Sequence, residues 1–189
     1  DEPGVLCRPY RLEEGGHALA IFFRHDALSN LIAFDLQKLP DPDAAAATLV
    51  ARIMEVADRL PVGSDHVLTL ALDGENTLSG YADDGRAFLA ALYRRLEADE
   101  VIRTVTFVEY LEGNAERDVA PHPIGEQERV HDLFTGSWID EPRSRPGVDL
   151  GTWIGEPEEN LAWVMLLCVR RDLAARGVTP ESAPAAFRA

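Results

Sequence analysis

The residues best suited to chemistry in this 189-residue chain follow a short apolar run. Residues 67–72 (VLTLAL) lead directly into Asp73, Gly74, Glu75 and Asn76. In parallel α/β architectures the carboxyl ends of strands carry the ligand and the catalytic groups. Two carboxylates there can divide into a general acid and a charged partner, if one is desolvated enough to stay protonated near neutral pH. The alternative is an ordinary turn between a strand and a helix, because Asp-Gly is a common turn signal.

A second polar cluster stands where another apolar run, residues 17–23, comes to its end. Arg24 and Asp26 lie directly beyond this run. These two side chains are suited to anchoring sugar hydroxyls or to orienting a carboxylate. The alternative is a surface salt bridge on a loop.

Two tryptophans occur in short motifs within irregular, proline-rich chain. Trp138 belongs to GSWI and Trp153 to TWIG. An aromatic face in a cleft suits a sugar ring and its hydroxyls. We expect Asp73 to stand at the floor of a cleft, and at least one of these two tryptophans to border it. The alternative is that both fasten the loops to the core beside Trp163, which lies in an apolar helical stretch and is expected in the core.

Composition limits the classes of partner. Asp and Glu outnumber Lys and Arg by 33 to 18, which gives a formal net charge of −15. Such a surface repels phosphate backbones and anionic lipids, so we expect no nucleic-acid or membrane partner, and a neutral polar substrate fits better. Cys7, Cys168 and the five histidines match no metal-ligand spacing, so no metal is expected.

The apolar spacing predicts an α/β fold with parallel strands. Runs at 17–23, 67–72 and 104–108 predict strands, and the intervening patterns predict helices starting near Pro42-Asp43 and near Asp84. The expected core positions of the first helix are Leu49, Ile53, Val56, Ala57 and Leu60. This alternation is a βαβαβ unit.

The remainder of the chain is different in character. Residues 113–155 contain four prolines and six glycines and predict long ordered loops. Pro157, Glu158 and Glu159 suit the first turn of a third helix, which is expected to run to Ala175 and stop at Gly177.

The order of several motifs resembles glycoside hydrolase family 57, in particular its bacterial amylase- or mannosidase-like members. These motifs are FFRHDALSNLIAF, LALDGEN, DDGRAFLAALYRRLEADEVIRTVTFVEYL, GSWI and WIGEPEENLAW, which extend from about Cys7 to Ala175. The resemblance implies the C-terminal half of a TIM-like (β/α)7 barrel in residues 1–112. It further implies a loop-rich and helical region in residues 113–189 that completes the cleft.

The same resemblance implies retaining cleavage or transfer of α-glucan linkages without a cofactor. Asp73 takes the place of the family's general acid/base, and Glu75 is the neighbouring acid of its motif. Arg24, Asp26, Glu75, Trp138 and Trp153 are the expected substrate-binding residues. A retaining mechanism needs a second carboxylate about 5–5.5 Å from the acid. The segment that supplies this nucleophile in the family has no counterpart here, so the chain is expected to be inactive by itself.

Two functions therefore remain open. The first is part of a glycosidase or glucanotransferase, whose partners are an α-glucan and the remainder of its own catalytic domain. The second is a non-catalytic carbohydrate-binding or regulatory domain derived from that fold. The resemblance and the lack of a cysteine framework favour a cytoplasmic location.

Overall fold

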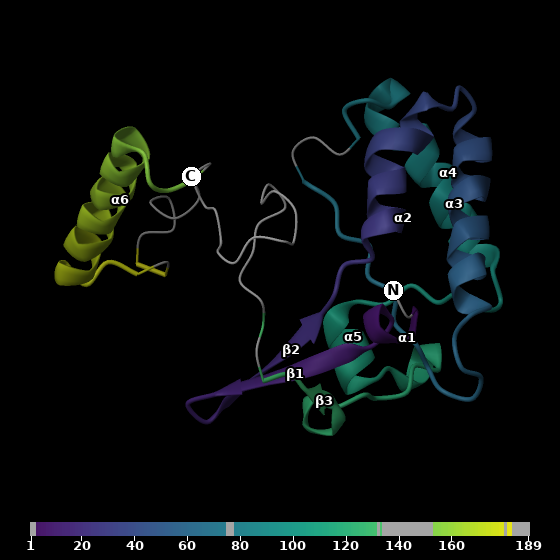
Figure 1. The fold of residues 1–189 in the computed structure, drawn as a ribbon, viewed down its shortest axis with the longest axis horizontal. Helices are drawn as coiled ribbons and strands as arrows, with labels where there is room; N and C mark the ends of the chain where they lie inside the picture. Colours follow the sequence, from purple (N-terminus) through teal and green to yellow (C-terminus); the bar gives the residue numbers. More distant parts are fainter. Residues whose placement is uncertain (1–2, 75–77, 132, 134–152, 180, 183–189) are drawn as a thin grey trace. The chain divides into compact units, whose positions relative to one another are not determined.

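The computed structural model describes residues 3–74, 78–131, 133, 153–179 and 181–182 of this chain (Figure 1). These fall into two compact units, residues 1–131 and residues 132–189, and each unit is considered by itself. The predicted division between residues 112 and 113 stays a prediction.

The first unit begins with the short helix α1 (Pro3–Leu6) and the hairpin of β1 (Pro9–Glu14) and β2 (His17–Phe22). The two strands are antiparallel, with Pro9 opposite Phe22. Gly15 and Gly16 form the turn with φ of 57° and 83°, values that suit glycine and the two-residue hairpin turns. The predicted strand 17–23 is confirmed as β2, and β1 was not foreseen because its polar residues hide the alternation.

The sheet has three strands, in the order β2-β1-β3. Strand β3 (Glu128–Arg129) pairs in parallel with β1, with Tyr10 opposite Glu128. The α/β class is thus confirmed, but the sheet is mixed rather than parallel as predicted, because β1 and β2 form an antiparallel hairpin. Within the described residues the strands form this small sheet and no barrel.

Two of the three predicted strands are not regular strands. In residues 67–72 only Thr69 makes a β-bridge, a parallel one to Arg24. The predicted strand 104–108 is wrong, because α5 (Phe107–Glu112) begins inside it. Thr106 is the N-cap of this helix and its hydroxyl accepts from the amide of Glu109, at 3.1 Å. The sequence Thr-Phe-Val-Glu is a helix-start signal that ends the extended run.

A pair of helices forms most of the core. Helices α3 (Pro42–Ala57) and α4 (Arg86–Ala98) pack against each other (Figure 1). The carboxylate of Asp41 caps α3 by accepting from the amide of Asp43. Leu49 and Val56 are buried as predicted, and they meet Phe88 and Leu92 of α4 in one apolar cluster.

A chain of short helices connects β2 to α3. It consists of α2 (Asp26–Asn30), the π-helical turn η1 (Leu31–Asp35) and the 3₁₀ turn η2 (Leu36–Lys38). Leu28, Ile32 and Leu36 of these turns enter the same apolar cluster as α3 and α4. This 26–38 segment is therefore fixed to the core along its length.

The remaining elements of the first unit are short. The 3₁₀ turn η3 (Ala82–Gly85) precedes α4, and η4 (Ala115–Arg117) and η5 (Ile124–Glu126) follow α5. This agrees with the loop-rich character expected from residue 113 onward.

The described part of the second unit is dominated by α6 (Pro157–Ala175), which confirms the third predicted helix. Glu156 and Glu159 form a reciprocal capping box at its start. Gly177, with φ of 62°, follows its end. Among the described residues, no helix is long and apolar enough to cross a membrane.

Candidate active site

The structure places the exit of β2 beside the segment that leads to Asp73. Arg24 forms the parallel bridge with Thr69, and the amide of His25 donates to the Thr69 carbonyl at 2.9 Å. The chain therefore leaves β2 next to the segment that leads to Asp73. Asp73 itself is exposed, four residues beyond Thr69, the last β-bridge residue of that segment.

Arg24 connects the two exits through its guanidinium. Its Nε donates to the carbonyl of Ala71 at 3.0 Å, two residues before Asp73. Its Nη1 donates to Oδ1 of Asp26 at 2.9 Å and its Nη2 to Oδ1 of Asn30 at 2.7 Å. The planar fork of an arginine suits such multiple recognition, so this side chain orients Asp26, whose side chain is 71% exposed.

A buried serine completes the junction. Ser29 is 0% exposed, and its Oγ accepts from the amide of Ala71 at 3.2 Å. With Arg24 on the carbonyl, both backbone polar groups of Ala71 are bonded to side chains. No motif singled out Ser29, because a serine within a five-residue helix has no distinctive sequence pattern.

The family model described as Glycosyl hydrolase family 57 matches residues 3–124, more than half of the chain. This chain belongs to glycosyl hydrolase family 57. No curated protein and no solved structure matches it.

The family match covers the first unit's candidate residues and ends before both tryptophans of interest. Arg24, Asp26 and Asp73 lie inside the matched range and are described by the structure. Glu75 lies inside the range, but outside the described residues. The GSWI and WIGEPEEN motifs follow the matched range, so their part in the family 57 site stays a prediction.

Of the two predicted cleft tryptophans, Trp138 lies outside the described residues. Trp153 lies in the second unit and is 41% exposed. Its carbonyl accepts from the indole Nε1 of Trp163 at 2.7 Å. Trp163, expected in the core, is 47% exposed within this unit, because its helix buries none of its described residues there.

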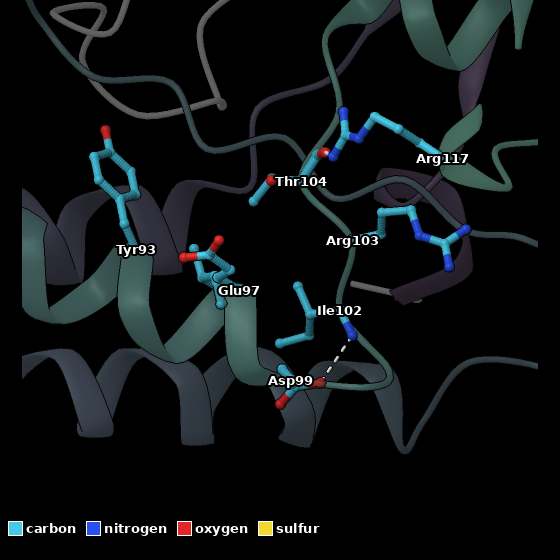
Figure 2. Close-up of a pocket in the computed structure, with 8 residues that line it drawn as sticks. Tyr93, Glu97, Asp99, Ile102, Arg103, Thr104 and Arg117 are labelled. Atoms are coloured by element: carbon cyan, nitrogen blue, oxygen red, sulfur yellow. Dashed lines mark hydrogen bonds between the residues drawn. The ribbon is translucent and has the colours of Figure 1, made fainter. Parts of the chain in front are cut away.

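The structure also contains a pocket that no motif indicated. It has a volume of about 430 Å³ and lies between α4 and residues 102–104. Figure 2 shows Tyr93 and Glu97 of α4 on one side and Thr104 and Arg117 on the other. Arg117 donates to the Thr104 carbonyl at 2.8 Å and Arg103 to the carbonyl of Asp118.

The guanidinium groups that line this pocket donate hydrogen bonds to other groups of the protein. Arg117 donates to both carboxylate oxygens of Glu109, at 2.7 and 2.6 Å, and Asn114 donates to the same carboxylate at 2.8 Å. Desolvation acts to raise the pKa of Glu109, but the bonds from Asn114 and Arg117 outweigh it and hold the pKa below its ordinary value. Arg117, which lines the pocket, is therefore already paired with a carboxylate outside the lining, and the carboxyl groups that line the pocket are those of Glu97 and Asp99.

No group of three or more His, Cys, Asp or Glu side chains in the described part of the chain is arranged to hold a metal ion. The candidate site is a set of carboxyl and guanidinium groups. Its elements are the exposed Asp73, the exposed Asp26 and the guanidinium of Arg24 that links their segments.

Proposed function

We propose that this chain contributes Asp73 as the general acid/base of a retaining glycoside hydrolase or glucanotransferase that acts on α-glucans. One observation carries the proposal. Within the range matched by family 57, Asp73 follows an extended segment that is bonded to the exit of β2, where Arg24 and Asp26 lie. The exits of neighbouring parallel segments are where α/β enzymes place reacting groups.

The proposed reaction needs two carboxyl groups. The Asp73 carboxyl gives its proton to the glycosidic oxygen as the bond to the sugar carbon breaks, while a second carboxylate attacks that carbon from about 5–5.5 Å away. The Asp73 carboxylate then takes a proton from water or from a sugar hydroxyl, which displaces the second carboxylate. We propose that this nucleophile belongs to a segment outside these 189 residues.

The exposure of Asp73 bears on how it would hold a proton. A carboxyl group that acts as an acid near neutral pH needs removal from water. Asp73 is exposed on this chain. We propose that the bound glycan and the remainder of the catalytic domain supply this desolvation.

Substrate binding is proposed for five side chains. Arg24 holds Oδ1 of Asp26, which leaves Oδ2 of that exposed carboxylate to accept a sugar hydroxyl. Glu75 accepts from hydroxyls near the reacting bond, and Trp138 and Trp153 offer aromatic faces to the sugar rings.

The Asp73→Asn substitution tests this proposal in the natural protein of which we propose this chain is a part. We expect loss of most turnover on an unactivated α-glucan, by about 10²–10⁴-fold, with the melting temperature retained. A smaller loss is expected on an activated aryl α-glucoside, whose leaving group needs little protonation. Asp58→Asn, which changes another exposed aspartate at the end of α3, is the matched control. Wild-type turnover of Asp73→Asn on the glucan would refute the acid/base role.

The second candidate is a non-catalytic carbohydrate-binding domain, and the exposure of Asp73 favours it. If it is correct, the natural protein binds α-glucan without cleaving it, and Asp73→Asn weakens binding no more than Asp58→Asn does. Titration of both variants with a maltooligosaccharide, together with the turnover assay, separates the two candidates.

A further inference from the structure

The chain on either side of Asp73 is attached to one neighbouring element, the 26–38 segment made of α2, η1 and η2. Before Asp73, Ala71 is bonded to Ser29 of this segment and to Arg24, which lies just before the segment in the chain. After Asp73, the hydroxyl of Tyr81 donates to the carbonyl of Ile32 at 2.6 Å. Both attachments lead to a segment that is itself anchored in the core by Leu28, Ile32 and Leu36.

The attachment before Asp73 takes the place of strand pairing. Thr69 is the last residue of this segment with a β-bridge in the described chain. At Ala71 two side chains take the place of a neighbouring strand. The Ser29 hydroxyl accepts from the Ala71 amide, and the Arg24 guanidinium donates to the Ala71 carbonyl. Because Ser29 is fully buried, water does not compete for its hydroxyl, and its removal leaves the Ala71 amide without this partner.

The attachment after Asp73 combines a hydrogen bond with ring packing. The Tyr81 ring stacks on the buried Phe88 with centroids 4.8 Å apart. Burial raises the pKa of Tyr81 to about 12, so its hydroxyl stays protonated and able to donate. Next to it, Gly80 lies against the end of the Gln37 side chain in η2, which a Cβ at residue 80 would displace.

We infer that Ser29 and Tyr81 are positioning residues, which hold the two flanks of Asp73 on the 26–38 segment and so set where the Asp73 carboxyl stands. The inference rests on the proposed acid/base role of Asp73. Proton transfer in the transition state depends on placement to within a fraction of a hydrogen-bond length. Loosening either flank should therefore impair the protonation of a leaving group more than it impairs substrate binding.

The first experiment measures the attachment without any catalysis. Amide hydrogen exchange of Ala71 is compared in the 189-residue chain and its variants. In Ser29→Ala we expect exchange at Ala71 to be at least about fivefold faster, and Ser29→Thr, which keeps the hydroxyl, should restore most of the protection. Thr48→Ala is the matched control, because it removes a hydroxyl that bonds to the carbonyl of Ala44 within α3. Unchanged exchange at Ala71 in Ser29→Ala would overturn the inference for the first flank.

The second experiment measures the consequence for chemistry in the natural protein. It compares kcat on an alkyl α-glucoside, which needs its leaving group protonated, with kcat on an activated aryl α-glucoside. For Tyr81→Phe and for Ser29→Ala we expect the ratio of the two to fall by about tenfold, with KM nearly unchanged. Tyr93→Phe is the control, since Tyr93 is 60% exposed and makes no hydrogen bond with the described residues. An equal loss on both substrates, or none on either, would contradict the positioning role.

The acid/base role of Asp73 and the positioning role of Ser29 and Tyr81 would be contradicted by different results. If Asp73→Asn itself leaves the ratio of the two substrates unchanged, the acid/base role of Asp73 is wrong. Amide exchange then decides by itself whether Ser29 holds Ala71. If Asp73→Asn lowers the ratio and the Ser29 and Tyr81 variants do not, the acid/base role stands and the positioning role is wrong.

Discussion

At the scale of single residues, side chains suited to chemistry also do structural work at this site. Three of the five N–H groups of Arg24 donate to acceptors of the protein, on Ala71, Asp26 and Asn30. We expect the remaining two N–H groups to be those that Arg24 can donate to a sugar hydroxyl. Asp26 is the more exposed of the pair, so we place the main contact to a hydroxyl on its carboxylate.

Tyr81 provides a test of the geometry by titration alone. Its folded pKa of about 12 lies above the ordinary value of 10.0. The stability it contributes is therefore fully present below pH 10 and is lost as the pH rises toward 12. We expect the ultraviolet absorbance of phenolate to show a step near pH 12 that Tyr81→Phe removes and Tyr93→Phe retains. A tyrosine titration in which Tyr81→Phe leaves the step near pH 12 in place would contradict the buried hydroxyl.

The Trp153→Ala variant tests whether the Trp153 side chain binds sugar or packs against its own unit. Trp153→Ala removes a side chain that is 41% exposed but keeps the carbonyl that accepts from Trp163. We expect maltooligosaccharide affinity to fall about three- to tenfold, with the melting temperature nearly unchanged. Calorimetric titration and thermal unfolding measure the two effects. A lower melting temperature with unchanged affinity would show that Trp153 packs against its own unit instead.

At the scale of elements, the start of α5 shows how local signals compete. Residues 104–108 are apolar and β-branched enough to predict a strand, yet Thr106 caps a helix that begins at Phe107. Phe107 then packs on Phe22 at the end of β2, with ring centroids 4.6 Å apart. The helix start thus lies at the exit of β2, from which the candidate site begins.

The ion pair that joins α5 to η4 gives this region a pH dependence. Because the folded pKa of Glu109 is lowered, its contribution to stability is present above its ordinary value of 4.5 and is lost as the pH falls through the folded pKa. We expect the loss of urea stability between pH 6 and pH 3 to be smaller in Glu109→Gln than in the wild type. Glu112→Gln, at the exposed end of the same helix, should keep the wild-type pH dependence. The same pH dependence in both variants would show that the pair with Arg117 contributes nothing measurable.

At the scale of the whole molecule, the family match and the candidate site fall in the same unit. The match to family 57 ends at residue 124, within the unit of residues 1–131. Asp73 is exposed beyond the segment that is bonded to Arg24, and we propose that it supplies half of the carboxyl pair that retention requires. The other half is the nucleophilic carboxylate, which we propose belongs to another segment of the natural protein.

The 189-residue chain by itself tests whether the nucleophile lies outside it. We expect it to turn over an activated aryl α-glucoside no faster than background, because the attacking carboxylate is proposed to lie elsewhere. Glu109 does not fill this role well, since Arg117 and Asn114 already bind its carboxylate. Turnover at the rate of a complete enzyme would reveal a nucleophile within the chain, and Glu75→Gln would be the first variant to examine.

The sequence alone determined those features that depend on local periodicity and on motif order. Apolar spacing predicted α3, α4 and α6, because a helix buries one face every three to four residues. The motif order identified family 57, which the family match confirms. The tertiary structure decided which polar groups satisfy which backbone atoms, and that depends on contacts between residues far apart in sequence. Ser29 and Ala71 are forty-two positions apart, and Tyr81 and Ile32 are forty-nine, so no local pattern announces either bond. For the same reason the run 67–72 has the composition of a buried strand, yet in the described chain it makes one β-bridge, a backbone hydrogen bond from Val67 to the carbonyl of Cys7, and bonds to the side chains of Ser29 and Arg24.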